Sequence, residues 1–425
     1  MHPDQQYEWT HLKIIGFKRL KFALSLRLHF LFMSLSKERY YSLDVFRGAT
    51  IAFMIMVNNP GSWSYMYEPL KHAPWHGVTP TDLVFPFFLF AVGNAMAFVI
   101  PRMREKPASV FWKKVIKRTL LIFLIGLFLN WSPFIRWSGD ELVFRHWVDP
   151  NNPESGIRIF GVLQRIAVAY FFAAVIAYFA SFRTAVYISL LLLLAYWVLL
   201  YVGGTAGDPY SLEGFLGTRV DKAVLGVAHM YKGEGVPFDP EGIVSSVTGI
   251  SQVLFGYFAG VYIREKGKNF DMLSHLLLAG VALWVIGMAW GTVFPINKKI
   301  WTSSYVLYTT GLALMLLGFL IYLIEFQGKK GWWSSFFDDF GKNPLFIFVL
   351  SGFLPRVIAL FRWQTGVNDK GEAVYTSLLP WLNKTFIAPI GSDPRIGSLL
   401  YSVLFIIAFW AIAHWMNKQR IYIKV

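Results

Sequence analysis

Residues 71–90 read KHAPWHGVTPTDLVFPFFLF. A polar loop with two histidines runs directly into a hydrophobic segment, and an acid, Asp82, lies near the start of that segment. Chemistry at a membrane surface needs this combination, because a titratable group within reach of water is held by a rigid apolar element. Histidine is the side chain that most readily gives and takes protons near neutral pH. The stretch predicts a membrane helix that begins beside a candidate site.

The rest of the chain is equally apolar. Of its 425 residues, 55% are hydrophobic and 15% are charged, and the mean hydropathy is +0.47. A soluble globular protein usually carries about a quarter charged residues, and an apolar run of about 20 residues is long enough to cross a bilayer. The composition predicts an all-α, polytopic membrane protein with about ten transmembrane helices. The predicted spans are 44–61, 80–101, 110–131, 157–180, 183–203, 241–263, 272–294, 300–324, 342–363 and 396–416.

The net charge of +15 suggests nucleic acid at first sight, but its placement favours a membrane orientation. With the amino terminus in the cytoplasm, Lys and Arg are about twice as frequent inside as outside, as the positive-inside rule requires. Segment 102–118 alone places seven of them inside. We therefore expect both termini in the cytoplasm, the long loops 62–79, 132–156, 204–240 and 364–395 outside as irregular structure, and no nucleic-acid partner.

The amino-terminal residues differ in character from the rest of the chain. We divide the chain into a basic cytoplasmic segment, 1–42, and a transmembrane domain, 43–425. Two interpretations stay open for residues 1–32: a basic helix at the membrane interface, or a segment ahead of a natural start at Met33. The chain has no cysteine, which excludes disulfides and thiolate sites. No metal-ligand spacing is present either, so we expect no metal.

Ionisable side chains inside membrane spans are costly and therefore mark candidate functional positions. Asp44 and Arg47 lie three residues apart on one helical face and can simply pair. Arg158 and Arg165 lie two turns apart on one face. They can meet phosphates or pair with acids of neighbouring helices, Asp44 or Asp82 among them. The remaining polar residues of the spans are Asn58, Asn59, Asn94, Gln164, Gln252, Arg356 and His414.

Several motifs follow one another along the chain: SLDVFRG (42–48), VNN (57–59), KHAPW (71–75), TDLVFP (81–86), RIFGVLQR (158–165), DPEG (239–242), FPINK (294–298) with Trp301, and GKNP (341–344). In this order they closely resemble the heparan-α-glucosaminide N-acetyltransferase family, multispan enzymes that carry acetyl groups across a membrane onto glucosamine. The resemblance covers nearly all of residues 42–425, but the large soluble amino-terminal domain of the lysosomal enzyme has no counterpart here.

The resemblance implies an acetyl-CoA-dependent acyltransferase of a bacterial cytoplasmic (inner) membrane. Acetyl-CoA would enter from the cytoplasm as co-substrate, and the amino-sugar acceptor would enter from outside. The catalytic histidine of the family falls on His72 and its partner asparagine on Asn58. Direct transfer and an acetyl-histidine intermediate both stay open.

The candidate catalytic residues suit this chemistry. A protonated amine must lose a proton before it attacks a thioester, and His72 fits the general base or a transient acetyl carrier. Asn58 can donate a hydrogen bond to the developing oxyanion, a contact typically worth roughly 3 kcal/mol of barrier. Asp82 can orient the imidazole, hold the substrate ammonium or only cap its helix.

Further contacts are expected around these residues. For the phosphates of the donor we expect Arg47 near the inner end of the first span and Arg165 about 10 Å deeper than Arg158 by helix rise. The candidate acceptor-binding residues are Trp75, Asp239, Glu241, Asn297 and Lys298, and Trp301 can also stack on a sugar. The carboxylates are equally explained as helix-dipole partners. An amino-sugar transporter and a non-catalytic scaffold are the alternatives, and a homodimer is a further expectation.

Overall fold

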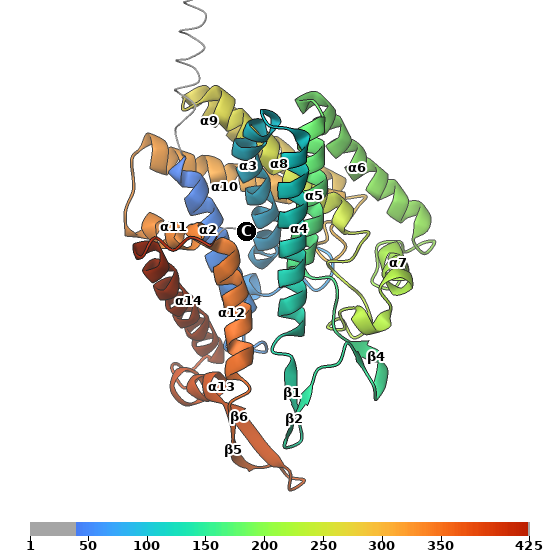
Figure 1. Ribbon diagram of the computed structural model, residues 1–425, viewed down its shortest axis with the longest axis vertical. Helices are drawn as coiled ribbons and strands as arrows, with labels where there is room; N and C mark the ends of the chain where they lie inside the picture. Colours follow the sequence, from blue (N-terminus) through green and yellow to red (C-terminus); the bar gives the residue numbers. More distant parts are fainter. Residues whose placement is uncertain (1–39, 424–425) are drawn as a thin grey trace, which may run out of the picture.

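The computed structural model describes residues 40–423. The two interpretations of residues 1–32, and nearly all of the predicted segment 1–42, lie outside the described residues. The helices stand as a bundle, and three small hairpins and short helices project from one end of it (Figure 1). The longer helices are α2 (Tyr41–Asn58), α3 (Val84–Arg104), α4 (Ala108–Trp131), α5 (Val162–Phe179), α6 (Phe182–Gly203), α8 (Ser246–Lys266), α9 (Phe270–Trp290), α10 (Ser303–Ile321), α12 (Pro344–Ile358) and α14 (Pro394–Lys418).

One of these helices lies over each of the ten predicted spans. Among the described residues, seven helices are long and apolar enough to cross a membrane: those containing α3, α5, α6, α8, α9, α10 and α14. Helix α12 has only 15 residues, and the first half of α4 contains four Lys and Arg. Helix α2 carries Asp44 and Arg47 in its first turns. The protein is a polytopic helical membrane protein, and the count of ten spans stays a prediction.

The prediction of a purely α-helical chain with irregular outer loops was wrong in two of those loops. They fold into antiparallel hairpins, and Gly139 (φ 58°) and Gly371 (φ 78°) supply the left-handed conformation in the connections of two of them. These loops contain residues that favour turns and strands, but their high content of Gly, Pro and Asn led to the prediction of irregular structure. The strands are β1 (Ile135–Ser138) with β2 (Glu141–Phe144), β3 (Val148–Asp149) with β4 (Asn152–Gly156), and β5 (Arg362–Val367) with β6 (Ala373–Ser377).

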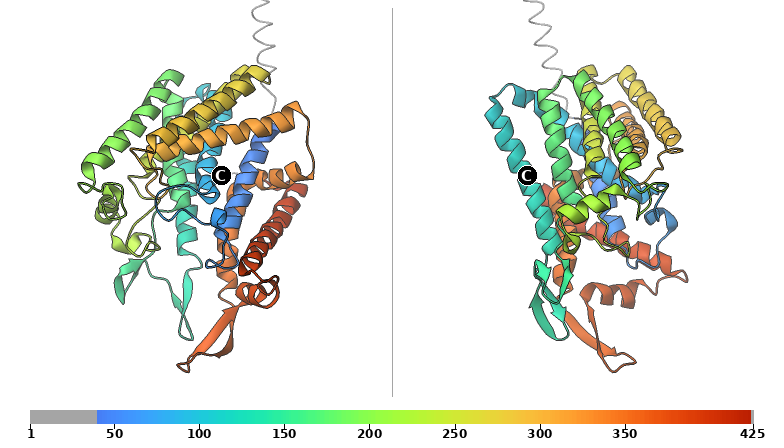
Figure 2. Two further views of the ribbon diagram at one scale, coloured as in Figure 1. Left: turned by 180° about the vertical axis from the view of Figure 1, so that it is seen from behind. Right: turned by 90° about the vertical axis from the view of Figure 1, so that its right-hand side faces the viewer.

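Short helices complete the architecture and connect the long ones. Helices α9 and α10 lie side by side and cross the remaining bundle obliquely (Figure 2). The short helices are η1 (Glu68–Leu70), η2 (Pro80–Leu83), α7 (Leu216–Val224), η3 (Val227–His229), the π-helix η4 (Tyr322–Phe326), α11 (Trp332–Lys342), α13 (Leu378–Leu382) and the π-helix η5 (Asn383–Ile387).

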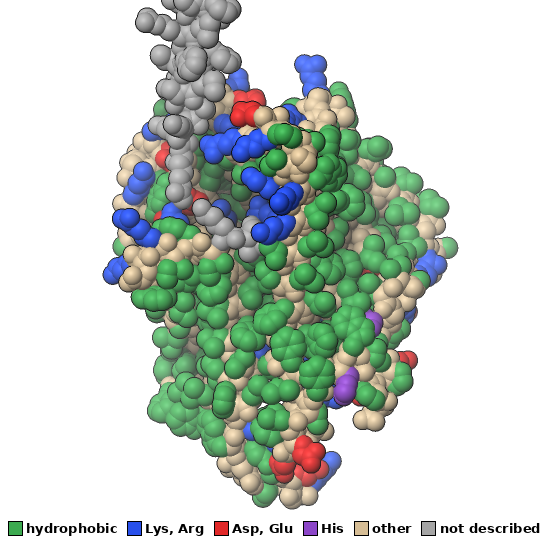
Figure 3. Space-filling view, in the orientation of Figure 1, with side chains coloured by type: hydrophobic (Ala, Val, Ile, Leu, Met, Phe, Trp, Pro, Cys, Tyr) green, Lys and Arg blue, Asp and Glu red, His purple; other side chains and the backbone are tan. Residues whose placement is uncertain are grey.

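Charged side chains are distributed unevenly over the surface. Lys and Arg side chains gather at the end of the molecule where α9 and the upper ends of α3 and α4 lie, whereas the middle of this face is mainly hydrophobic (Figure 3). The hairpins lie at the opposite end. The basic end is therefore the expected cytoplasmic side, and the hairpin end is the expected outer side.

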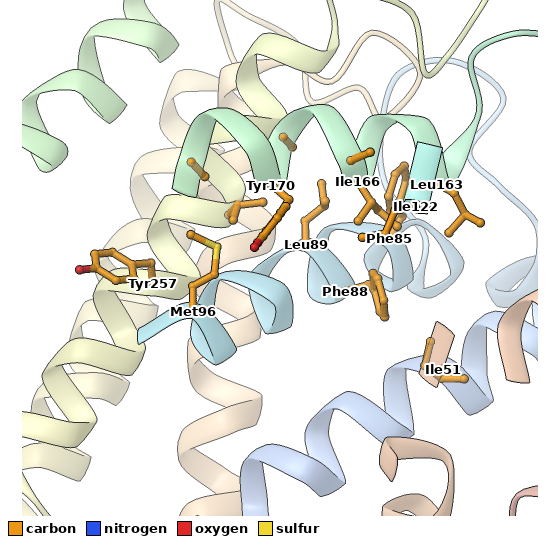
Figure 4. Close-up of a cluster of buried hydrophobic side chains, with 14 of the residues drawn as sticks. Ile51, Phe85, Phe88, Leu89, Met96, Ile122, Leu163, Ile166, Tyr170 and Tyr257 are labelled. Carbon is orange, nitrogen blue, oxygen red and sulfur yellow. The ribbon is translucent and has the colours of Figure 1, made fainter. Parts of the chain in front are cut away.

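The core lies where α3 packs against α8 and α5. Phe85, Phe88 and Leu89 of α3 meet Ile166 and other side chains of α5 in a cluster of buried hydrophobic side chains (Figure 4). Helices α3 and α8 approach closely because glycines face the partner backbone: a Cβ on Gly93 would lie 1.7 Å from the carbonyl oxygen of Val253. Small residues permit such contacts in membrane bundles.

Replacing Gly256 by alanine is expected to destabilise the bundle strongly. Its added Cβ would lie 2.0 Å from the backbone oxygen of Phe90, so α3 and α8 would have to separate. Overpacking of this kind typically costs about 1–3 kcal/mol. The apparent Tm in detergent, followed by the monodisperse fraction on size exclusion, measures the effect. Gly366→Ala is the control, because no atom lies within 4 Å of its added Cβ; an equal loss in both variants would contradict the packing argument.

Candidate functional site

The loop that joins η1 to η2 folds back so that His72 meets Asp82. Nδ1 of His72 lies 2.6 Å from Oδ1 of Asp82. The imidazole side chain is 42% exposed, whereas the carboxylate is 1% exposed. Because His72 and Asp82 lie ten residues apart in the sequence, the sequence alone did not show whether they are in contact. In the structure they are in contact.

Asp82 also caps its own helix, so both interpretations of this residue describe real contacts. Its Oδ2 accepts hydrogen bonds from the backbone N–H groups of Ala73 and Thr79, each at 3.0 Å. The hydroxyl of Thr79 donates to the same oxygen at 3.1 Å, and the hydroxyl of Tyr305 donates to the backbone oxygen of Asp82. One carboxylate oxygen holds the loop and the other faces the imidazole. These hydrogen bonds fix the orientation of Asp82, the partner of His72.

A second loop, between α9 and α10, is fastened to the His72 loop. The N–H of Gly77 donates to the carbonyl of Ile296 at 2.8 Å. Nδ2 of Asn297 lies 3.3 Å from Nδ1 of His76, and the ammonium of Lys299 donates to the carbonyl of Pro74 at 2.7 Å. These hydrogen bonds fix the position of Lys298, the residue between Asn297 and Lys299.

That residue, Lys298, reaches the His72–Asp82 pair. Its Nζ lies 3.0 Å from Nδ1 and 3.3 Å from Nε2 of His72, and 3.5 Å from Oδ1 of Asp82. Burial lowers the pKa of Lys298, and the charges of Asp82 and Glu241 oppose that shift. A cation, an anion and an imidazole therefore share one small volume.

The Lys298 loop ends at Trp301, which has a positive φ of 49°. Such a conformation is an outlier for a bulky residue and persists only where surrounding contacts hold it. The ring packs edge-on against Phe85 at 4.9 Å and lies 4.7 Å from the guanidinium of Arg165, and it is 1% exposed. The expectation that Trp301 stacks on a sugar is wrong, because its ring is enclosed by protein.

Arg158 forms a buried ion-pair cluster with two acids. Its guanidinium donates to Asp239 at 2.6 and 3.1 Å and to Glu241 at 2.5 Å. Burial disfavours ionisation of Glu241, but Arg158 and Arg165 outweigh it and lower the pKa of that carboxyl. Arg158 precedes α5, which begins at Val162, so its predicted place inside a span was wrong. Its partners are these acids and not Asp44 or Asp82.

These groups surround one cavity of about 240 Å³ at the outer ends of α2, η2 and α5. Asn58, the last residue of α2, is exposed there. The polar lining residues are Asn58, His72, Trp75, Thr81, Asp82, Arg158, Tyr231, Glu234, Glu241, Lys298 and Lys299, and the apolar ones are Met54, Val57, Ala73, Val84, Phe85, Val162 and Pro240.

Six of the ten residues predicted for the site thus lie on one cavity: His72, Asn58, Asp82, Trp75, Glu241 and Lys298. The other four, Asp239, Asn297, Arg165 and Arg47, are not on the lining that the described residues form. Asp239 and Asn297 are 0% exposed.

Asn297 and Arg165 are occupied inside the protein. Oδ1 of Asn297 accepts the N–H of Ile300 at 3.1 Å. Arg165 is 0% exposed and donates to the carbonyl of Pro240 at 2.5 Å and to the hydroxyl of Ser245. Arg165 is therefore enclosed by carbonyl and hydroxyl groups in the structure, and its assignment to the donor stays a prediction.

Arg47 lies near the start of α2, far along the helix from Asn58. It donates to Asp44 at 2.9 Å and to the backbone carbonyl of Gly341 at 3.1 Å. The predicted pairing of Asp44 with Arg47 is confirmed. The GKNP motif that contains Gly341 therefore packs against the SLDVFRG motif.

Sequence reasoning missed several lining residues. Lys299 pairs with Glu234 at 2.6 Å, and its ammonium lies 5.8 Å from the ring of Trp75. Tyr231 lies under the guanidinium of Arg158, 4.8 Å away. Tyr231 and Glu234 come from an outer loop that carried no motif. Their only sequence signal was a position a few residues ahead of the matched DPEG segment.

The fold and site define a polytopic helical membrane protein with a polar, charged cavity built on a His–Asp pair at one membrane face. Residues 39–211, which include His72, Asn58 and Asp82, match the model of a family described as heparan-alpha-glucosaminide N-acetyltransferase, catalytic. Residues 39–211 are thus similar to the catalytic model of this family, in agreement with the resemblance inferred from the motifs.

Curated relatives agree with that match. The chain is 28% identical over 377 residues to the human heparan-alpha-glucosaminide N-acetyltransferase, covering 75% of this chain and 53% of the human protein. It is 27% identical over 393 residues to the mouse protein of the same name, covering 77% and 55% respectively. The chain thus spans about half the length of the curated relatives it matches.

Proposed function

We propose that this protein is a transmembrane N-acetyltransferase of a cytoplasmic (inner) membrane. It moves an acetyl group from cytoplasmic acetyl-CoA to the amine of a glucosamine-type sugar on the outer side. The observation that carries the proposal is the 2.6 Å contact between His72 and Asp82 on a cavity shared with Asn58. All three residues lie in the segment that matches the catalytic family model.

The contact supports Nε2 of His72 as the base. An anionic Asp82 accepts the Nδ1–H, so the lone pair of the neutral imidazole is on Nε2. Nε2 takes a proton from the acceptor ammonium, and the freed amine forms a C–N bond with the thioester carbonyl. The attacking nitrogen then loses its second proton to water as it becomes the amide nitrogen. The C–S bond breaks, and the coenzyme A thiolate leaves and receives the proton held on Nε2. A general base near pH 7 suits this sequence of transfers.

The same tautomer supports the second route. Nε2 could attack the thioester itself, form an acetyl-imidazole while the thiolate leaves, and pass the acetyl group to the deprotonated amine. Asp82 stabilises the positive imidazole ring in both routes. Rapid mixing with labelled acetyl-CoA and no acceptor distinguishes them: label bound to the protein, and lost on adding glucosamine, supports the covalent route.

Acceptor binding is proposed to use the outer wall of the cavity. The indole N–H of Trp75 donates to the carbonyl of Tyr210 at 2.9 Å, which fixes the ring as a surface for a sugar face. Glu241 and Asp239 share the single guanidinium of Arg158. Glu241 is the carboxylate of this cluster that lines the cavity, and we assign it the contact with the cationic amine. For the donor, Arg47 stays the proposed contact at the cytoplasmic end.

Asn58→Ala is expected to lower kcat by about 10²–10³-fold, the usual effect of removing one oxyanion donor. Its side chain is exposed at the end of α2, so the substitution should leave folding unchanged. The measurement is kcat and KM for acetyl transfer. Asn59→Ala is the matched control, because Nδ2 of Asn59 donates to the backbone of its own helix at Ile55. A change in KM alone at Asn58 would contradict the oxyanion role.

The function is tested on purified full-length protein in detergent and in vesicles. With labelled acetyl-CoA and glucosamine, we expect N-acetylglucosamine to form in detergent. In vesicles of defined orientation, product should form only when acetyl-CoA faces the basic end and the sugar faces the hairpin end. Uptake of unmodified sugar without any acetylated product would overturn the proposal in favour of transport.

A further inference from the structure

We propose that Lys298 is a positioning residue whose ammonium keeps His72 neutral before each turnover and drives the proton onward after His72 has taken it. The proposal rests on the acetyltransferase function above and deepens it. Lys298 was expected to bind the acceptor. The structure instead places its Nζ within 3.3 Å of both ring nitrogens of His72.

Lys298 is held in this place by its loop and has little freedom to turn toward a substrate. Asn297 on one side has its backbone N–H bound to Thr302 at 3.0 Å and its side chain bound to Ile300. Trp301 has a positive φ, and its side chain is buried in the protein. The carbonyl of Ile300 accepts the hydroxyl of Tyr196. A strained, fully bonded loop is a typical way to fix one side chain at a functional site.

Two opposite charges, those of Lys298 and Asp82, lie next to the imidazole of His72. The ammonium of Lys298, 3.0 Å from Nδ1, disfavours the imidazolium, whereas the carboxylate of Asp82, 2.6 Å from the same nitrogen, favours it. Because Asp82 also lies 3.5 Å from Lys298, the carboxylate is already balanced by the ammonium. The resting site is then an anion, a cation and a neutral imidazole. The other titratable or charged groups on or beside the cavity are Lys71, His76, Arg158, Tyr231, Glu234, Glu241, Lys299 and Tyr305.

More distant groups do not replace this effect, because they are engaged with each other. Lys299 is paired with Glu234, and Glu241 is paired with Arg158. Lys71 is paired with Glu68 at 2.7 Å. Lys298 is therefore the cation whose charge acts directly on the imidazole. Removing that charge should leave Asp82 alone with His72 and stabilise the imidazolium.

The ammonium of Lys298 also favours release of the proton from His72 during the reaction. When Nε2 takes the proton from the acceptor ammonium, two cations lie side by side. Their repulsion favours transfer of the proton from Nε2 to the leaving thiolate, which restores the neutral imidazole and yields the free thiol. Lys298 does not bond to either substrate in this scheme. Its effect is on the proton affinity of His72.

The test measures the protonation of His72 directly and needs no activity. Full-length protein with ¹⁵N-labelled histidine is titrated by NMR in detergent, and the His72 signals are assigned by their loss in His72→Asn. In Lys298→Met we expect the pKa of His72 to rise by about one unit or more, as removal of a close like charge allows. Lys298→Arg keeps the charge and should keep the pKa. Lys298→Gln is a second neutral variant should the methionine variant fold poorly.

Lys299→Met is the matched control, since its ammonium contacts Glu234 and Pro74 and not His72. An unchanged His72 pKa in both neutral Lys298 variants, or an equal rise in Lys299→Met, overturns the proposal. If acetyl transfer is also observed, the acidic limb of kcat/KM against pH should move upward by the same amount in Lys298→Met and return in Lys298→Arg. If no transfer is observed, the titration still decides the role of Lys298, and only the proposed reaction fails.

Discussion

His72→Ala is expected to lower kcat for acetyl transfer by about 10²–10⁴-fold, the usual contribution of a positioned general base. The loss follows from the geometry: Nδ1 is held by Asp82 at 2.6 Å, and the half-exposed ring lines the cavity. Steady-state rates with labelled acetyl-CoA and glucosamine measure the effect. Added imidazole should restore part of the rate, because the substitution leaves space beside Asp82 for a small base.

Folding must be separated from chemistry in this variant. His146→Ala is a matched control, because this histidine is exposed in an outer loop and is not on the cavity lining. Elution profile and thermal stability should match the unmodified protein for both variants. Turnover in His72→Ala within a factor of ten of the unmodified protein would remove His72 from the mechanism.

Arg158→Met is expected to lower the free energy of unfolding by about 3–5 kcal/mol, the typical result of leaving buried charges without their partner. Asp239 is 0% exposed, and both it and Glu241 depend on this guanidinium. Thermal or denaturant unfolding in detergent provides the measurement. The unpaired carboxyls should take up protons on folding, since their pKa values then exceed those of the unfolded chain. Stability of the variant should therefore rise as pH falls toward 5.

A rescue experiment checks that the cause is electrostatic. Asp239→Asn with Glu241→Gln, combined with Arg158→Met, removes the buried charges and should recover much of the lost stability. Arg136→Met is the surface control, because Arg136 is 59% exposed in its pair with Asp149, and exposed pairs contribute little. A pH-independent loss in Arg158→Met would point to lost packing against Tyr231 instead.

Much of the membrane architecture follows from local sequence. An apolar run as long as residues 84–104 has few alternatives to a membrane helix, since every backbone polar group in lipid must be bonded within the segment. Charge bias gives the orientation by the same local logic. The motif at 71–86 likewise contains both members of the His72–Asp82 pair, because the capping contacts of Asp82 are made within that one short segment.

The sequence predicted the helix boundaries and the structure of the outer loops less accurately. Arg158 was placed in a span because its neighbours are apolar, but α5 begins at Val162 and Arg158 turns to two acids from a loop 81 and 83 residues away. The hairpins depended on turn residues such as Gly139, whose signal is weak in a loop rich in Gly and Pro.

The class of helical membrane protein and the loop that carries His72 follow from residues that lie close together in the chain, and the expected orientation rests on the charge bias alone. Only the tertiary structure decided what surrounds the imidazole. Lys298 lies 226 residues from His72 in sequence, and Arg165 became a buried structural residue because Ser245 and Pro240 closed around it. Long-range packing sets those distances, and a charge acts on a neighbour only through the distance and the burial that packing provides.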